Sequence, residues 1–198
     1  MAEGLPRLTA VRRARPGRVE LEVDGRRWRL VPDEVVLRCG LAAGLELDRP
    51  LLRALRRELR RAEALGAAVR TVSRRDVSTR RLHDRLAARG VRRADAERAV
   101  ATLAGAGVLD DAKTAASRAR ALEERGWGDA AVAARLAGEG FGADDVRAAL
   151  AELRPERERA DALVARVSDP GAAWKLLARR GFAPETLDDV VGTLDADR

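Results

Sequence analysis

The 198-residue sequence is poor in the residues that build disulfides, metal centres and aromatic cores. Its single cysteine, Cys39, rules out an intramolecular disulfide framework. Its single histidine, His83, cannot by itself form a metal site or a catalytic pair. Tyrosine is absent, and with 2 Phe and 3 Trp the apolar residues are mostly Ala, Leu and Val. This inventory favours helices packed at close range and argues against an all-β protein.

The sequence also lacks an apolar run of membrane-spanning length and an apolar signal-peptide core at its N-terminus. We therefore expect a protein of the reducing cytoplasm that does not associate with a membrane. Glycine-rich phosphate loops, Ser/His/Asp sets and Cys/His clusters are missing as well. We expect no enzyme activity, so no ATPase or nuclease turnover, and neither a metal nor another cofactor.

Positive charge is abundant, with a net charge of +7 and a sequence pI of about 11.0. Such a balance indicates an acidic partner, either nucleic acid or an anionic protein surface. Arginine-rich usage also follows from GC-rich coding, so the placement of charge is more informative than its amount. Residues 51–93 contain 14 Arg and 4 acidic residues, a net of +10, which leaves −3 for the rest of the chain. The alternative interpretation of this segment is a solvated helix face.

The N-terminal part of the chain has the pattern of a small sheet. Short apolar runs in residues 8–31 are separated by Pro16-Gly17 and Asp24-Gly25, which predicts a three-stranded antiparallel meander. The following "PDEVVLRCGL" predicts a short helix that covers the sheet. We expect Trp28 to fill the small core, with stacking on nucleic acid as its alternative role.

The period becomes helical from residue 50 onward. Apolar residues recur at spacings of three and four and predict one stripe of a long helix. They are Leu51, Leu55, Leu59, Ala62, Leu65, Val69 and Val72.

One phrase then occurs three times, as "RLAARGV", "RLAGEGF" and "LLARRGF". Each ends with a glycine and an apolar residue, and twelve residues before each glycine stands a residue suited to cap a helix N-terminus. The glycines are Gly90, Gly140 and Gly181, and the capping positions are Ser78, Gly128 and Asp169. Each phrase therefore predicts a helical hairpin whose turn is made by a left-handed glycine.

Another helical stretch precedes each hairpin, over residues 51–75, 112–125 and 156–167. We expect Asp110 and Asp111 to cap the second of these stretches. Trp127 is expected to pack inward beneath its turn, and Trp174 to be buried in the core. The predicted fold class is mainly α, with three tandem three-helix repeats that form an elongated curved rod behind the small N-terminal meander. The predicted parts are residues 1–49, 50–104, 105–154 and 155–198, in a monomer.

Three segments resemble the RecX family of bacterial regulatory proteins. They are "RRDVSTRRLHDRLAARGV", "AGVLDDAKTAASRARALEERGWGDAAVAARLAGEGF" and "WKLLARRGFAPETLDDVV". The resemblance spans residues 51–194, and its most specific part is "VLDD" followed by a basic residue, Lys113. The sequence departs from the family pattern at Thr114, where an aromatic residue is usual, at Arg81, where Glu is frequent, and in "GVRRADA", which lacks the usual acidic cap pair.

The resemblance implies a regulator of RecA, usually an inhibitor, that lodges in the groove of the RecA filament on single-stranded DNA. ATP hydrolysis, strand exchange and coprotease activity would then fall together, with consequences for homologous recombination, DNA repair and the SOS response. The candidate contacts to RecA or DNA are Arg74, Arg75, Arg80, Arg81, Arg85, Arg89, Arg92, Arg93 and Lys113.

Two other classes of function stay open. In the first, the protein binds DNA directly, either single- or double-stranded. On duplex DNA a hairpin helix would enter the major groove, with Arg80, Arg81, Arg85 and Arg89 partly along one flank of that helix. In the second, it is a generic helical-repeat scaffold with no link to nucleic acid. Insensitivity of partner binding to salt would favour the scaffold.

Overall fold

The computed structural model describes residues 5–196, and within them three strands are followed by ten helices. The strands β1 (Leu8–Arg15), β2 (Arg18–Val23) and β3 (Arg26–Pro32) form an antiparallel sheet in the order β1-β2-β3. The prediction of a mainly α protein with a small N-terminal meander is confirmed. The turns are made where expected, with positive φ at Gly17 and at the pair Asp24-Gly25.

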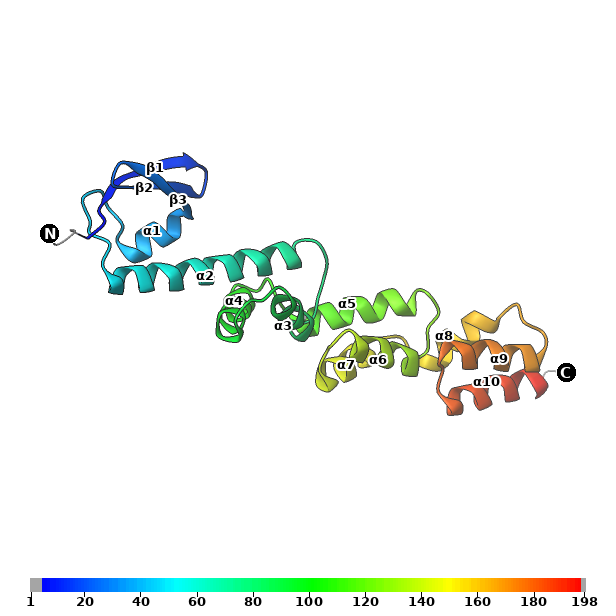
Figure 1. The fold of residues 1–198 in the computed structure, drawn as a ribbon. Coiled ribbons are helices and arrows are strands. Elements are labelled where there is room, and N and C mark those ends of the chain that lie inside the picture. Colours follow the sequence, from blue (N-terminus) through cyan, green and yellow to red (C-terminus); the bar gives the residue numbers. More distant parts are fainter. Residues whose placement is uncertain (1–4, 197–198) are drawn as a thin grey trace. The chain divides into compact units, whose positions relative to one another are not determined.

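Helix α1 (Asp33–Cys39) lies against β2 and β3 and ends at Gly40 in the left-handed conformation (Figure 1). Its Val35 joins the buried side chains of the sheet and of the next helix in one core. The buried members of that core are Leu8, Leu21, Val31, Val35, Leu41, Leu55 and Leu59.

Trp28 does not belong to this core, and the prediction of its burial is wrong. Its side chain is 42% exposed. In the pairing of β2 with β3, Leu21 lies opposite Arg29 and Glu22 opposite Arg27, so Trp28 is left without a partner in a register shift. Side chains alternate between the two faces of a strand, so Trp28 lies with Leu30, which is 41% exposed, on the face opposite the buried Val31.

Helix α2 (Arg49–Val72) is the long helix that the apolar spacing predicts. Its first half buries Leu55 and Leu59, as expected. Further along, the buried residues are Ala64, Ala67, Ala68 and Thr71. Val69 is 42% exposed, so its place in the stripe is wrong. The buried face of α2 thus changes along its length, and the N-terminal core packs on it through Leu51, Leu55, Leu59 and Ala62.

The remaining helices follow in the predicted order of one leading helix and one hairpin. The hairpins are α3–α4, α6–α7 and α9–α10, and the leading helices of the second and third repeats are α5 and α8. The turn glycines Gly90, Gly140 and Gly181 have φ of 75°, 89° and 72°. The bounds are α3 (Thr79–Ala88), α4 (Arg93–Gly105), α5 (Asp111–Glu123), α6 (Asp129–Gly138), α7 (Ala143–Ala151), α8 (Glu156–Val164), α9 (Pro170–Arg180) and α10 (Pro184–Ala196).

The chain divides into two compact units. The first comprises the residues up to Arg70 together with Leu86–Thr102, and the second comprises Thr71–Arg85 and Leu103–Arg198. The second unit contains one core among α5, α6 and α7 and another among α8, α9 and α10 (Figure 1). The division into repeats at residues 50, 105 and 155 and the curved-rod shape stay predictions.

Trp127 packs partly buried against the core of α5, α6 and α7, as expected. Trp174 is 48% exposed, so the prediction that it is buried is wrong. In α9 the inward positions are Ala173 and Leu177, four residues apart, and both are fully buried. Trp174 follows Ala173 by one residue and so points about 100° away from the core face.

Candidate partner-binding site at the repeat joints

The second unit contains two contacts of the same kind, which we call the first and second joints. In each, the start of one hairpin meets the turn of the next hairpin. The first joint brings Ser78, before α3, to Glu139 and Gly140 between α6 and α7. The second joint brings Gly128, before α6, to Arg180 at the end of α9 and to Gly181 after it.

Ser78 occupies the centre of the first joint and is 1% exposed. Its hydroxyl donates a hydrogen bond to the Glu139 carbonyl at 2.6 Å and accepts one from the Arg81 amide at 3.2 Å. The side chain therefore caps α3 and joins it to the next repeat. Gly140 allows this approach, since a Cβ there would lie 2.9 Å from the Ser78 oxygen.

The second joint is closed by backbone atoms. The Gly128 amide donates to the Arg180 carbonyl at 2.9 Å. A Cβ on Gly128 would lie 2.4 Å from the Gly181 carbonyl oxygen, and one on Gly181 would lie 2.5 Å from the Ala131 Cβ. The two backbones therefore approach more closely than any side chain at these positions would allow.

An acidic residue at the start of the next leading helix completes each joint. Asp111, the first residue of α5, accepts hydrogen bonds from the Thr79 amide at 2.8 Å and from its hydroxyl at 3.0 Å. Glu156, the first residue of α8, accepts one from the Asp129 amide at 2.6 Å. The cap of α5 itself is Asp110, which accepts from the Lys113 amide at 3.0 Å, so Asp111 acts on α3 and not on its own helix.

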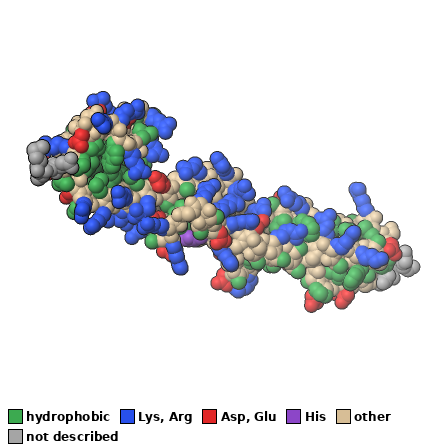
Figure 2. Space-filling view, viewed as in Figure 1, with side chains coloured by type: hydrophobic (Ala, Val, Ile, Leu, Met, Phe, Trp, Pro, Cys, Tyr) green, Lys and Arg blue, Asp and Glu red, His purple; other side chains and the backbone are tan. Residues whose placement is uncertain are grey.

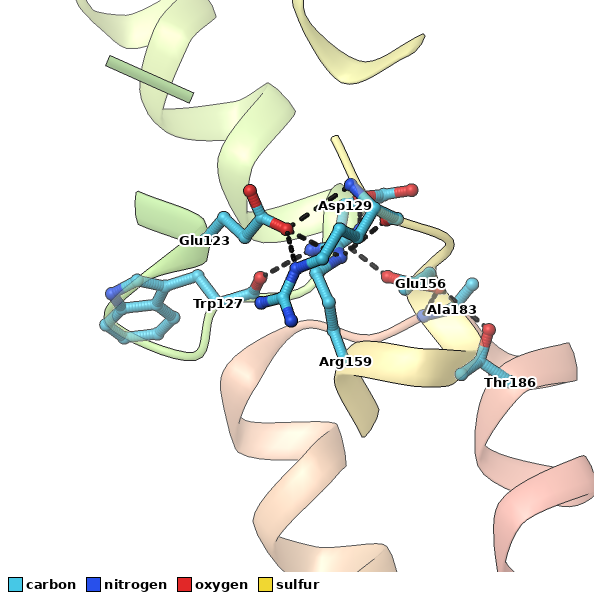
Figure 3. Close-up of polar contacts among 8 residues, drawn as sticks. Glu123, Trp127, Asp129, Glu156, Arg159, Ala183 and Thr186 are labelled. Carbon is cyan, nitrogen blue, oxygen red and sulfur yellow. Dashed lines mark hydrogen bonds and ion pairs between the residues drawn. The ribbon is translucent and has the colours of Figure 1, made fainter. Parts of the chain in front are cut away.

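Glu156 and Arg159 hold the second joint together from α8 (Figure 3). The other Glu156 oxygen accepts from the Ala183 amide at 3.1 Å and the Thr186 hydroxyl at 2.8 Å. The Arg159 side chain, 4% exposed, donates to the Trp127 carbonyl at 3.0 Å and forms an ion pair with Asp129. This buried guanidinium satisfies backbone and carboxylate acceptors from the preceding repeat.

The Trp127 ring fills the second joint. The Arg135 guanidinium carbon lies 3.5 Å from the ring centroid, and that of Arg180 lies 5.2 Å away. Both distances are within the range of cation–π attraction.

The first joint has a surface pocket of about 360 Å³ beside it. Its walls come from the segment before α3, from α3 itself, from α5 and from the turn after α6. The lining residues are Arg75, Asp76, Val77, Ser78, Arg81, Arg85, Arg118 and Glu139.

The charges of this pocket do not cancel. Arg118 and Glu139 form two hydrogen bonds, of 3.0 Å from Nε and 2.5 Å from the guanidinium end. The hydrogen bond to Glu139 raises the pKa of Arg118, against the opposing effect of burial, and attraction by Glu139 and Asp76 raises it further. Among the described residues, Arg75 and Arg81 have no hydrogen-bond or ion-pair partner for their side chains. The pocket therefore keeps an excess of positive charge.

The other arginines expected to bind the partner are not gathered here. Arg74 and Arg80 are exposed outside the pocket, and the stem of Arg80 passes beside Gly140. Arg89, Arg92 and Arg93 belong to the first unit. Arg93 forms an ion pair with Glu97 at 2.7 Å, and this hydrogen bond raises the pKa of Arg93. Lys113 is exposed on α5, and Asp169 caps α9 by accepting from the Ala172 amide at 2.7 Å.

Arg118, Glu139 and Arg159 were not among the predicted site residues. In the sequence Arg118 and Arg159 lie in predicted helices and Glu139 lies directly before a turn glycine. Their partners come from segments distant in the chain, within one repeat for the pair Arg118 and Glu139 and from the preceding repeat for Arg159. The sequence signal for two of them was the second segment of the resemblance, which includes Arg118 and Glu139 without assigning either a role.

The first unit contains a separate ion-pair cluster around Glu58, which is 8% exposed. Its carboxylate lies 2.6 Å from Arg61, 3.5 Å from Arg57 and 3.6 Å from Arg38. Burial raises the pKa of the nearby Cys39 thiol, and the negative charge of Glu58 raises it further. In Figure 2, Lys and Arg side chains surround the hydrophobic surface of this unit.

Among residues 5–196 no three His, Cys, Asp or Glu side chains are grouped so as to hold a metal ion. In the same part of the chain no helix has the length and apolarity needed to cross a membrane.

Comparison with known proteins shows which proteins this chain is similar to. No protein-family model matches the chain. It is 36% identical over 129 residues to the regulatory protein RecX of Xanthomonas campestris pv. campestris strain B100, covering 60% of this chain and 77% of that protein. The same protein of strain 8004 gives the same values.

Two solved structures have the same fold. A crystal structure of regulatory protein RecX aligns with a TM-score of 0.80 at 20% identity, covering 94% of this chain and 98% of the other. A crystal structure of RecX from Lactobacillus salivarius aligns with a TM-score of 0.64 at 16% identity, covering 69% of this chain and 97% of the other.

Fold and joints together define a helical-repeat protein with a basic pocket and with no grouped metal ligands in the described part. The identity to curated relatives gives the family: the chain belongs to the RecX family of regulatory proteins.

Proposed function

We propose that this protein regulates RecA recombinase, as an inhibitor, by binding in the groove of the RecA filament formed on single-stranded DNA. Membership of a family of regulatory proteins supports the regulatory role. ATP hydrolysis, strand exchange and coprotease activity of the filament then fall together, because one bound protein obstructs the same groove. The protein acts as a monomer without a cofactor.

The observation that carries this proposal is the position of Arg75, Arg81 and Arg85 around one pocket at the first joint. A filament on DNA presents phosphates and protein surfaces of mixed charge. Guanidinium groups are suited to such a target because their planar donors match phosphate and carboxylate oxygens in pairs. We place the first contact with the filament here.

The remaining contacts form an outer ring in this proposal. They supply long-range attraction, which depends on salt, while the pocket supplies orientation. This ring consists of Arg74, Arg80, Arg89, Arg92, Arg93 and Lys113.

The test is the DNA-dependent ATPase of RecA, measured while the protein is titrated in. We expect the wild-type protein to suppress hydrolysis and the double variant Arg81→Glu/Arg85→Glu to do so at least several-fold less well. The difference should be larger at low salt, because exposed charges are screened at high salt. The slope of log affinity against log salt should flatten by about 0.7 for each single-strand phosphate that the variant no longer binds.

A matched control is Arg166→Glu/Arg179→Glu, which changes the net charge equally at two exposed positions in the same unit. It should inhibit like the wild type. Equal inhibition by both double variants across a salt series would remove the first joint from the mechanism.

The same titration separates the alternative functions. Tight binding to duplex DNA without RecA, abolished in the Arg81→Glu/Arg85→Glu variant, would favour a direct DNA-binding protein. Unchanged ATPase at every protein concentration would contradict regulation of RecA and favour a scaffold for another partner.

A further inference from the structure

The two joints provide an internal comparison, because equivalent positions are set by the hairpin glycines. Counting back from Gly90 and Gly140, Val77 corresponds to Trp127 and Arg85 to Arg135. Counting from Gly140 and Gly181, Glu139 corresponds to Arg180.

At the second joint these three positions form a stack, with Trp127 lying against Arg135 and near Arg180. At the first joint the same three positions, Val77, Arg85 and Glu139, line the pocket. Replacing an indole by the much smaller valine side chain leaves this space open. The pocket is therefore the counterpart of a site that the protein fills with its own flat ring one repeat later.

We propose that this pocket binds one nucleotide of single-stranded DNA, with the base stacked on the guanidinium of Arg85 and the adjacent phosphate held by Arg75 and Arg81. The inference goes beyond regulation of RecA, because the binding requires no recombinase.

The ligand must combine a flat ring with a negative charge beside it. The flat ring is inferred from the second joint, where the Arg135 guanidinium stacks on the Trp127 indole. A guanidinium plane can stack on a nucleic-acid base in the same way. The charge follows from Arg75 and Arg81, whose side chains have no partner among the described residues. The carboxylates facing the pocket are Asp76 and Glu139, and the second of these is neutralised by Arg118.

The strand must be single because a paired base has its faces covered by its neighbours in the duplex stack. Extruding it carries an energetic penalty, whereas an unpaired base offers its face with little opposition. Phosphate contacts alone would attract single- and double-stranded DNA alike. The affinity that depends on the presence of unpaired bases is therefore the quantity that reports on this pocket.

The experiment measures fluorescence anisotropy of a labelled thymidine oligonucleotide about 20 nucleotides long and of an abasic strand with the same phosphates, using the full chain without RecA. We expect the wild-type protein to bind the thymidine strand at least about fivefold more tightly, in line with stacking energies of single bases. Because RecA is absent, a negative result here leaves the ATPase titration to decide the proposed function by itself.

Val77→Trp supplies the ring that the second joint already has and alters no charge. We expect it to reduce the ratio of the two affinities to about one while binding of the abasic strand is retained. Arg85→Lys keeps the charge and removes the plane, so it should also lower the ratio. Circular dichroism checks folding, and if Val77→Trp unfolds the protein, Arg85→Lys decides.

Two matched controls should keep the wild-type ratio. Val108→Trp adds the same ring at a position that is 56% exposed, and Arg179→Lys makes the same exchange at an exposed arginine. Equal wild-type affinity for the two strands overturns the proposal, as does an unchanged ratio in folded Val77→Trp and Arg85→Lys. So does tighter binding of an acidic peptide containing Trp, if Val77→Trp abolishes it, since the pocket would then accept a protein segment.

Discussion

The first and second joints bring equivalent segments together, but a side chain closes the first and the backbone closes the second. Both bring a helix start against a glycine turn, and both place an acidic residue of the next helix on the exposed amide of that start. The second joint then fills its interior with Trp127 and binds it with Arg159. The first has Val77 at the equivalent position and an open pocket with excess positive charge.

This difference shows that the repeated hairpin determines where the repeats contact each other. A few side chains then determine whether the contact is filled or leaves an open, charged pocket. The turn glycine occurs in both joints because in each a Cβ at that position would clash with the neighbouring segment. The ring and the buried guanidinium of the second joint contribute stability. Arg75 and Arg81 of the first joint contribute little to stability and leave positive charge accessible at the surface.

Removing Arg159 should have the largest effect, if the second joint is stabilised by that buried guanidinium. Arg159→Ala leaves the Asp129 carboxylate and the Trp127 carbonyl without their partner, so we expect the free energy of unfolding to fall by about 3 kcal/mol. Urea denaturation measures it. The control Arg157→Ala removes half-exposed contacts with Asp161, Asp189 and Thr193 and should cost less than about 1 kcal/mol. Equal losses of unfolding free energy in the two variants would contradict a stabilising role for the buried Arg159 guanidinium.

The turn glycines provide the next test, because one of them lies at a joint and another does not have a close neighbour. A Cβ at Gly90 meets no atom within 4 Å, so only the left-handed conformation opposes Gly90→Ala, at about 1 kcal/mol. Gly181→Ala adds a contact of 2.5 Å with the Ala131 Cβ and should cost at least about 2 kcal/mol. Thermal denaturation should rank them in this order; the reverse order would contradict the close approach at the second joint.

The acidic residues allow the two joints to be compared directly. Glu156→Ala frees the Asp129 and Ala183 amides, and Asp111→Ala frees the Thr79 amide, so each should cost about 1–2 kcal/mol, with the larger effect for Glu156. Chemical denaturation of both variants beside Asp110→Ala, an ordinary cap, gives the scale. An effect near zero for both would mean that the joints do not depend on these carboxylates.

The smallest expected difference concerns the arginines themselves. Arg135→Gln removes the stacking on Trp127 and should cost about 0.5–1 kcal/mol. Arg81→Gln, at an exposed side chain in the first joint, should change the free energy of unfolding by less than about 0.5 kcal/mol. A larger destabilisation by Arg81→Gln would make this arginine part of the packing and weaken its proposed role in binding.

The repeated hairpins could be predicted from the sequence because their causes are local. A left-handed glycine, a capping residue twelve positions earlier and an apolar residue after the turn lie within one stretch of chain, and Gly90, Gly140 and Gly181 all have the expected conformation. The N-terminal meander was predictable for the same reason, since Pro16-Gly17 and Asp24-Gly25 specify their turns by backbone preference.

Tertiary structure decided which of these local pieces meet, and no single stretch of sequence contains that information. Trp28 is exposed because the face of β3 that carries Val31 packs on the core and the other face does not, and Trp174 because of the orientation of its helix on a core. Arg159 is buried because α8 approaches the Trp127 turn 32 residues earlier in the chain. The basic pocket likewise exists only where α3, α5 and the turn after α6 come together, since packing between distant segments, and not local propensity, determines which charges find partners.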